Sequence, residues 1–352
     1  MTKTLSGNWN YPTQMIFGAG TIVQLSECCR GLGMTKPLLI TDKGLADSAI
    51  VASALEITKK DGLNSGLFSA VKGNPTGQNV EDGVKAYHDG GYDGIIAFGG
   101  GSGIDAAKAI ALMVGQDRPL WDFEDSGDNW TRVKTEDMAP VVAVPTTAGT
   151  GSEVGRASVI TNEESHQKKL IFHANMLPAI VIADPELTIG LPPHLTAATG
   201  VDAFVHCFEA FCSPSYHPMA DGIALEGMRL IKEFLPRAYL NGSDMDARSN
   251  MLVAASMGAT AFQKGGGGSH ALAHPLGAVY DKHHGLLNAI ILPYVMRRNR
   301  EAIEERMELL ARVLNLSGNG FDAVLAWVLD FQQMISIPKN LAVIDIPLDR
   351  AA

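Results

Sequence analysis

The segment GIIAFGGGSGIDAAK, residues 94–108, decides the fold class of the N-terminal half of this 352-residue chain. Its first five residues read as a buried strand, glycines follow, and a helical pattern runs from about Gly103 to Val114. Working outward, further apolar strand candidates occur at residues 37–41, 66–68, 141–145 and 180–183, with helical patterns at 46–60 and 80–90. Alternating strands and helices are typical of a parallel sheet covered on both faces. We therefore predict an α/β domain over residues 1–188.

The second half of the sequence has a different pattern. Beyond Pro192 and Pro193 the strand signals fade, and helical patterns follow at residues 196–211, 218–235, 247–263, 286–294 and 301–313. The segment PELTIGLPP, residues 185–193, separates the two patterns. These features predict an all-α domain over residues 189–352.

The bulk composition limits the classes of function. A hydrophobic fraction of 46% supports two cores, and a net charge of −10 without a basic block argues against nucleic-acid binding. The four cysteines (Cys28, Cys29, Cys207 and Cys212) show no CxxC spacing, which favours a reducing compartment. The N-terminal residues lack the apolar core of a signal peptide, and no apolar run reaches membrane-spanning length. We expect a cytoplasmic protein without a membrane partner.

Four of the ten histidines lie within residues 270–284, behind the glycines of 265–268. His270 and His274 are separated by four residues, so a helix would present both imidazoles on one face. Their neighbours are largely apolar, and a buried imidazole needs a partner. One or two of these histidines could be core residues with hydrogen-bond partners while the others are exposed. Because several occur together, we favour a role as ligands of a divalent metal ion. Spacing alone leaves open whether His274 or His284 joins His270 as a ligand.

A second polar pair stands in an otherwise apolar helical pattern. The segment TAATGVDAFVHCFEAF, residues 196–211, carries Asp202 and His206 four residues apart. Together with two histidines of the first cluster, this pair would supply three imidazoles and one carboxylate. Such a set suits Fe²⁺, Zn²⁺ or a similar first-row metal. The sequence contains no HExxH motif, which argues against a zincin protease.

Three features of the N-terminal half indicate a dinucleotide. The loop at 99–108 follows a strand and opens a helix, where backbone N–H groups and the helix dipole favour a phosphate. A second loop, PTTAGTGSE at 145–153, is also rich in donors, and Asp42 ends the first predicted strand. A carboxylate at that position can accept from a ribose 2′-OH and repels a 2′-phosphate. Taken alone, the glycine loop could be a tight strand-to-helix turn and Asp42 could be a helix N-cap. Taken together, the three features favour a dinucleotide, and NAD over NADP.

These motifs, in this order, resemble those of the iron-containing (group III) alcohol dehydrogenases. The segments that carry the resemblance are TDKG (41–44), NPT (74–76), GGGSGIDAAK (99–108), PTTAGTGSE (145–153), LTAATGVDAFVH (195–206) and HALAHPLGAVYDKHHG (270–285). The resemblance covers about residues 11–345. It implies a Rossmann-like N-terminal domain that binds NAD, a helical metal-binding domain, and a metal in the cleft between them, an architecture shared with dehydroquinate synthases.

Residue roles follow from the resemblance by position. Asp202, His206, His270 and His284 are implied to be the metal ligands. His274 is implied to line the active site, where it could relay a proton or orient a ligand, and Pro275 is expected to disturb a regular helix there. His283 has no implied role. The implied cofactor-contact positions are Asp42, Asn74, Gly100, Gly101, Ser102, Asp105, Thr146, Thr147, Thr150, Ser152, Lys168 and Leu187.

The implied activity is the reversible, NAD- and Fe²⁺-dependent oxidation of a small primary alcohol or diol to the aldehyde, in a homodimer or larger homo-oligomer. Zn²⁺ is the alternative metal. The alternative activities are those of a lyase of the dehydroquinate synthase type and of a glycerol dehydrogenase-like polyol oxidoreductase.

The sequence departs from the family pattern in two places. Members of the family commonly have a bulkier residue within the segment that is Gly265–Gly268 here, so the wall near the metal is expected to be looser. They also commonly continue for another helix or two after the position of Ala352, and this departure is expected to affect the stability or closure of the C-terminal domain.

Overall fold

The computed structural model describes residues 6–9, for their backbone, and residues 13–347. The chain divides into two compact units. Unit 1 contains residues up to Thr147 together with Ser152–Thr188, and unit 2 contains Ala148–Gly151 together with the chain from Ile189 onward. The short segment Ala148–Gly151 therefore packs with unit 2, although its neighbours in the sequence belong to unit 1.

Unit 1 is built on a sheet whose described strands follow the order β1-β2-β9-β6-β5-β3-β4. Strand β1 pairs with β2 antiparallel, and the other neighbours pair parallel. The strands are β1 (Ser6–Trp9), β2 (Gln14–Gly18), β3 (Pro37–Asp42), β4 (Gly66–Val71), β5 (Gly94–Gly99), β6 (Val141–Pro145) and β9 (Ile180–Ala183). The parallel α/β sheet predicted for this half is confirmed.

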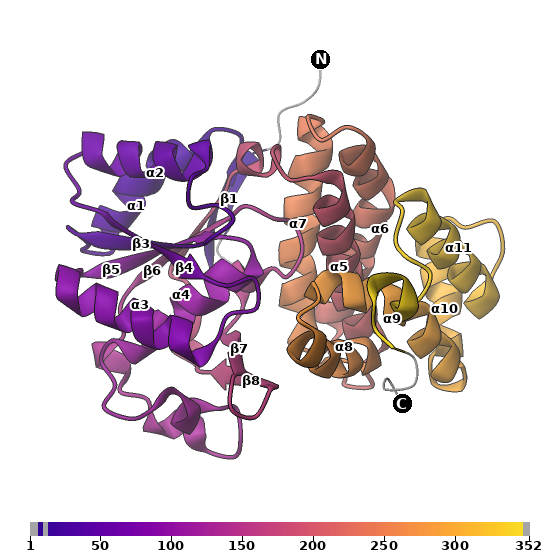
Figure 1. The fold of residues 1–352 in the computed structure, drawn as a ribbon. Coiled ribbons are helices and arrows are strands. Elements are labelled where there is room, and N and C mark those ends of the chain that lie inside the picture. The colour runs from indigo at the N-terminus through magenta and orange to yellow at the C-terminus, as the bar shows by residue number, and fades with distance from the viewer. Residues whose placement is uncertain (1–5, 10–12, 348–352) are drawn as a thin grey trace. The chain divides into compact units, whose positions relative to one another are not determined.

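Alternation along the strands sends side chains to both faces of this sheet, and helices cover both (Figure 1). Leu39, Phe98 and Val144 belong to a core that they form with α1 (Leu25–Gly31) and α2 (Ala49–Lys60). Helices α3 (Gly77–Gly90) and α4 (Gly101–Met113) pack together on the other face. Because α4 follows directly on β5, its first turn lies at the carboxyl edge of the sheet.

Unit 1 also contains a two-stranded antiparallel hairpin, which the sequence patterns did not predict. It consists of β7 (Ala157–Asn162) and β8 (Gln167–Phe172). The buried ammonium group of Lys108 on α4 donates to the carbonyl oxygens of Ser152, Gly155 and Ala157, at the approach to β7. This contact ties the hairpin and the loop after β6 to the helix that opens with the glycine motif.

Unit 2 is helical throughout its described residues, as predicted. Helix α5 is buried along almost its whole length and packs against α6, α7 and α9 (Figure 1). The helices are α5 (Pro193–Cys212), α6 (Pro218–Leu240), α7 (Met245–Phe262), α8 (Gly268–Tyr280), α9 (His284–Arg298), α10 (Arg300–Val313) and α11 (Gly320–Met334). None of the helices in the described residues has the length and apolar character needed to cross a bilayer.

One local expectation is wrong. Helix α8 runs from Gly268 to Tyr280 and continues through Pro275. Proline removes one backbone donor, but the residues on both sides of it are helical. His270 and His274 therefore lie on the same helix, four residues apart.

Candidate metal centre and nucleotide site

The candidate metal centre is built around the middle of α5. This helix consists mostly of small and apolar residues, yet Asp202 is 1% exposed and His206 is 7% exposed. Their spacing of four residues puts both side chains on one face of the helix. Buried polar groups of this kind require partners, and the partners come from α8 and α9.

Helix α8 supplies His270 and helix α9 supplies His284. Nε2 of His270 lies 3.9 Å from Oδ1 of Asp202, and Nε2 of His284 lies 3.8 Å from the same oxygen. The rings of His206 and His270 are stacked, with centroids 4.6 Å apart. One carboxylate and three imidazoles thus converge from three helices of unit 2.

The residues fit a first-row metal ion. The ligand atoms of Asp202, His206 and His270 lie within 4.8 Å of one another, and all three residues are buried. Nδ1 of His270 faces Glu209, whereas its buried Nε2 has no hydrogen-bond partner among the described residues. An imidazole nitrogen that faces a carboxylate and two further imidazoles without a hydrogen bond is suited to coordinate a cation.

The protonation states of these residues also favour metal binding. Burial lowers the pKa of His206 to about 4, so this imidazole is neutral at physiological pH and can donate a lone pair. Burial also acts to raise the pKa of Asp202, but the adjacent histidines and the Asn288 amide outweigh it and hold the pKa well below its usual range. A neutral imidazole and an ionised carboxylate are the protonation states that metal binding requires.

Two side chains that the sequence analysis did not assign orient these groups. The amide nitrogen of Asn288 donates to Oδ1 of Asp202 at 2.7 Å and lies 3.1 Å from Nε2 of His284. A carboxylate oxygen of Glu209 lies 2.7 Å from Nδ1 of His270. Both follow a candidate ligand at helical spacing, Asn288 four residues after His284 and Glu209 three residues after His206. Their helical spacing from a candidate ligand, within an otherwise apolar stripe, is the sequence signal by which these two polar residues could have been found.

The remaining histidines of the cluster differ in their surroundings. The ring centroid of His274 lies 5.1 Å from that of His284 and 6.0 Å from that of His270. His283 is exposed and caps α9 through its Nδ1, which accepts from the N–H of Leu286. His274 therefore borders the cluster, whereas the described contact of His283 serves the start of a helix.

The candidate phosphate site lies at the first turn of α4. Gly100 is the N-cap residue of α4, and it has no side chain of its own to cap this helix end. The N–H groups of Gly101 and Ser102 stand in the first turn, at the positive end of the helix dipole, where an anion can accept from them. A Cβ on Gly100 would lie 3.2 Å from the side chain of Thr147, so the backbone of the two loops is close-packed there.

The loop after β6 lies beside the loop after β5. The N–H of Thr146 donates to the carbonyl oxygen of Gly99 at 2.9 Å. Asp105 accepts a hydrogen bond from the hydroxyl of Ser152 and another, at 2.9 Å, from the N–H of Val159. The chain itself thus occupies both oxygens of Asp105, which fixes the second loop against α4.

Asp42 ends β3 at the same edge of the sheet. One of its oxygens accepts from the N–H of Gly44 at 2.8 Å, and the other faces Gly99, where a Cβ would lie 3.5 Å from it. The carboxylate therefore stands over the turn between β5 and α4. A 2′-phosphate at this position would meet its negative charge.

The other predicted cofactor residues fall into three places. Nζ of Lys168 donates to Oδ1 of Asn74 at 2.7 Å, which brings these two together, and the hydroxyl of Ser102 donates to the carbonyl of Gly73. Leu187 is buried in the core that unit 1 forms with α1 and α2. Thr150 belongs to Ala148–Gly151, which packs within unit 2.

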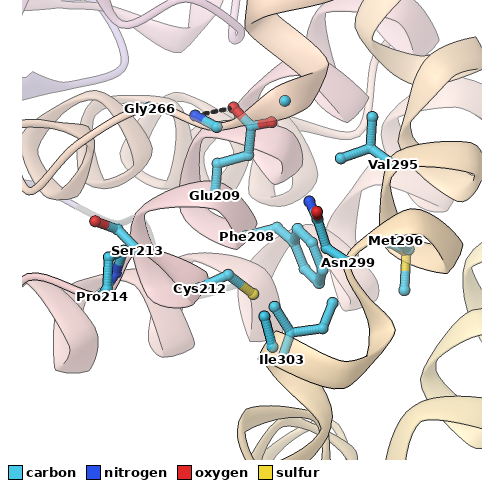
Figure 2. A pocket seen from close by; sticks show the side chains of 13 residues that line it. Phe208, Glu209, Cys212, Ser213, Pro214, Gly266, Val295, Met296, Asn299 and Ile303 are labelled. Atoms are coloured by element: carbon cyan, nitrogen blue, oxygen red, sulfur yellow. Dashed lines mark hydrogen bonds between the residues drawn. The ribbon is translucent and has the colours of Figure 1, made fainter.

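The glycine segment before α8 was expected to leave the wall near the metal loose. Its neighbours lie close: a Cβ on Gly267 would be 2.8 Å from Cδ of Glu209, and one on Gly268 would be 3.0 Å from Val295. Beside the segment lies a largely apolar pocket of about 200 Å³ (Figure 2). Its lining includes Glu209 but none of the four candidate ligands, so this pocket is behind His270 and separate from its Nε2.

Comparison with known proteins agrees with this arrangement over nearly the whole chain. The family model described as iron-containing alcohol dehydrogenase matches residues 12–185, and the model of the C-terminal domain of the same family matches residues 196–351. A 4-hydroxybutyrate dehydrogenase of Cupriavidus necator is 40% identical, over 94% of this chain and 87% of that protein. A 1,3-propanediol dehydrogenase of Klebsiella pneumoniae is 36% identical, over 94% of this chain and 86% of that protein.

Solved structures share the fold. A 1,3-propanediol oxidoreductase superposes with a TM-score of 0.88 at 34% identity, covering 98% of this chain and 90% of that one. A sulfoacetaldehyde reductase of Bifidobacterium kashiwanohense, solved in complex with NAD⁺, gives a TM-score of 0.87 at 27% identity, covering 99% and 90%. The matches span both units, the relatives are alcohol and diol dehydrogenases, and the predicted cofactors, NAD and Fe²⁺, are supported. The chain belongs to the iron-containing alcohol dehydrogenase family.

Proposed function

We propose that Asp202, His206, His270 and His284 hold the Fe²⁺ ion with which this protein, an NAD-dependent alcohol dehydrogenase, oxidises small primary alcohols to aldehydes. The observation that carries the assignment is the buried Asp202 carboxylate surrounded by imidazoles from three helices, with Nε2 of His270 lacking a hydrogen-bond partner among the described residues. Bound Fe²⁺ would polarise the alcohol oxygen as a Lewis acid, and bound NAD⁺ would accept the hydride.

The residues of the chain orient the reaction and handle its charge. Asp202 would offset one positive charge of the bound metal ion, and Asn288 holds its carboxylate through a 2.7 Å hydrogen bond. Oxidation of the alcohol releases one proton. We assign its acceptance to His274, whose ring borders those of His270 and His284 without belonging to the proposed ligand set.

For the dinucleotide, we propose that the first turn of α4 binds the pyrophosphate and that Asp42 receives the 2′-OH of the adenosine ribose. The glycine N-cap of α4 and the position of Asp42 beside Gly99 support this assignment. Further contacts are proposed for Asn74, Gly100, Gly101, Ser102, Asp105, Thr146, Thr147, Thr150, Ser152, Lys168 and Leu187.

Replacing Asp42 with serine is expected to change the preference between the two cofactors. The variant loses a hydrogen bond to a charged acceptor, worth about 1.5–3 kcal/mol, and it no longer repels a 2′-phosphate. We expect the ratio of kcat/KM for NADP⁺ over NAD⁺ to rise roughly 100-fold, measured by steady-state kinetics with saturating alcohol. Asp47→Ser, which removes an exposed carboxylate from the same loop, should leave the ratio unchanged. An unchanged ratio in Asp42→Ser would rule out this role.

For the substrate, we propose a short primary alcohol whose far end carries a second polar group. The support is that relatives 40% and 36% identical are named for 4-hydroxybutyrate and 1,3-propanediol. The test is NAD⁺ reduction by the Fe²⁺-loaded protein with 4-hydroxybutyrate, 1,3-propanediol and 1-butanol. We expect a higher kcat/KM for one of the first two than for 1-butanol. Metal and NAD⁺ binding without turnover of any alcohol would contradict the proposed function.

We further propose that the protein works in the cytoplasm as a homodimer or larger homo-oligomer. The proposal follows from the family resemblance and from the absence of paired cysteine spacing in the sequence. Light scattering coupled to size-exclusion chromatography would measure the assembly, and a monomer at micromolar concentration would contradict it.

A further inference from the structure

The Glu209 carboxylate is buried between the end of α5 and the start of α8, and three donors converge on it. Its Oε2 accepts from the N–H of Gly267 at 2.9 Å and faces Nδ1 of His270 at 2.7 Å. Its Oε1 accepts from the N–H of Ser269 at 2.6 Å. Figure 2 shows this carboxylate turned toward the backbone of the glycine segment. The residue itself is 4% exposed.

These contacts make Glu209 a cap for α8 supplied by another helix. The N-cap residue of α8 is Gly267, which has no side chain to satisfy the first N–H groups. The carboxylate from α5 takes this role, and its negative charge lies at the positive end of the helix dipole. Gly267 permits the close approach, because a Cβ there would be 2.8 Å from Cδ of Glu209. The start of the helix that carries His270 is therefore fixed by Glu209.

The same carboxylate sets the tautomer of His270. An ionised carboxylate can only accept, so Nδ1 of His270 must carry the hydrogen, and the lone pair is left on Nε2. That nitrogen faces Asp202, on the opposite side of the ring. An imidazole held by a carboxylate in this way is better oriented and more basic as a metal ligand.

We infer that Glu209 is a positioning residue that acts through His270: it locks the ring in the Nδ1–H form and aims Nε2 at the metal ion. The inference rests on the proposed function, because it takes His270 to be a ligand. Metal binding then requires the buried carboxylate behind His270 in addition to the four ligands. The inference also accounts for the glycine at position 267.

Glutamine at position 209 cannot reproduce these contacts. If its amide oxygen takes the place of Oε1, the NH₂ group faces Nδ1 of His270, where it favours the wrong tautomer, and it also faces the N–H of Gly267, which is itself a donor. If the oxygen takes the place of Oε2, the NH₂ group faces the N–H of Ser269, which is also a donor. In the first arrangement Nε2 carries the hydrogen and cannot coordinate, and in the second the start of α8 is disturbed.

The test is the affinity of the full chain for Co²⁺, measured by competition with a chromophoric chelator and by the visible spectrum of the bound ion. We expect Glu209→Gln to weaken Co²⁺ binding about 10–100-fold. Glu226→Gln, which removes an exposed carboxylate of α6, should bind as the unmodified protein does. Unchanged affinity in Glu209→Gln would overturn the inference. Failure of the unmodified protein to bind Co²⁺ would instead overturn the proposed metal site.

A double-mutant cycle separates positioning from a general structural role. In a His270→Ala background, Glu209→Gln should weaken Co²⁺ binding less than about twofold, because its target is gone. An equal loss in both backgrounds would overturn the inference.

A measurement on the unmodified protein avoids any folding defect of the variants. Nitrogen-15 NMR of the histidine rings in the Zn²⁺-loaded protein should show His270 with hydrogen on Nδ1 and metal on Nε2. Coordination of His270 through Nδ1 would overturn the inference.

Discussion

Replacing His284 with alanine is expected to abolish stoichiometric metal binding and to lower kcat/KM for alcohol oxidation roughly 10³-fold. A Lewis-acid metal contributes several kcal/mol to the stabilisation of developing negative charge, and about 4 kcal/mol corresponds to this factor. His284 points Nε2 toward Oδ1 of Asp202 from a helix different from the one that carries His270. Its loss leaves two imidazoles and one carboxylate. Metal content by atomic spectroscopy and steady-state kinetics measure both effects.

The adjacent histidine provides a matched control. His283→Ser removes an exposed imidazole one residue away, and serine is a good N-cap residue, so it can replace the contact that His283 makes at the start of α9. This variant should keep its metal and its activity. Equal losses in the two variants would show that the start of α9, and not the His284 ligand, is responsible.

The second large effect concerns the stability of unit 1. Lys108→Met is expected to lower the free energy of unfolding by roughly 3 kcal/mol or more. The carbonyl oxygens of Gly155 and Ala157 and the carboxylate of Asp105 would lose a buried donor, and the carbonyl of Ser152 would keep only the N–H of Gly155. Nζ of Lys108 lies 3.0 Å from the carbonyl of Ser152, 3.3 Å from that of Gly155 and 3.4 Å from Oδ1 of Asp105. Methionine has a similar length and shape but no donor. Denaturant unfolding followed by circular dichroism measures the difference.

Lys85→Met is the control for the loss of a lysine from unit 1. Lys85 pairs with Asp89 on α3, and both side chains are largely exposed, 74% and 64%. Such surface pairs contribute little, so we expect a change within about 0.5 kcal/mol. If both variants unfold at the same denaturant concentration as the unmodified protein, Lys108 does not hold the second loop in the way that its contacts indicate.

The sequence by itself was sufficient for the fold class of both halves. Buried parallel strands such as GIIAF at 94–98 are short apolar runs next to glycine turns, and their short length and flanking glycines distinguish them from buried helix segments. The hairpin β7–β8 escaped prediction because its strands alternate polar and apolar residues weakly. The helix through Pro275 escaped because proline usually ends a helix, whereas packing within α8 and its neighbours overrides that preference here.

The sequence also determined which residue types would serve the candidate site, since Asp202, His206 and the histidines at 270–284 are conspicuous in apolar surroundings. It could not bring them together by spacing, because α5, α8 and α9 are separated by long stretches of chain. Only the tertiary structure shows that Glu209 lies behind His270, that Asn288 holds Asp202 and that Lys108 fixes the loop before β7. These contacts are side-chain hydrogen bonds between elements far apart in sequence, and local periodicity can mark a polar residue in an apolar stripe but does not identify its partner.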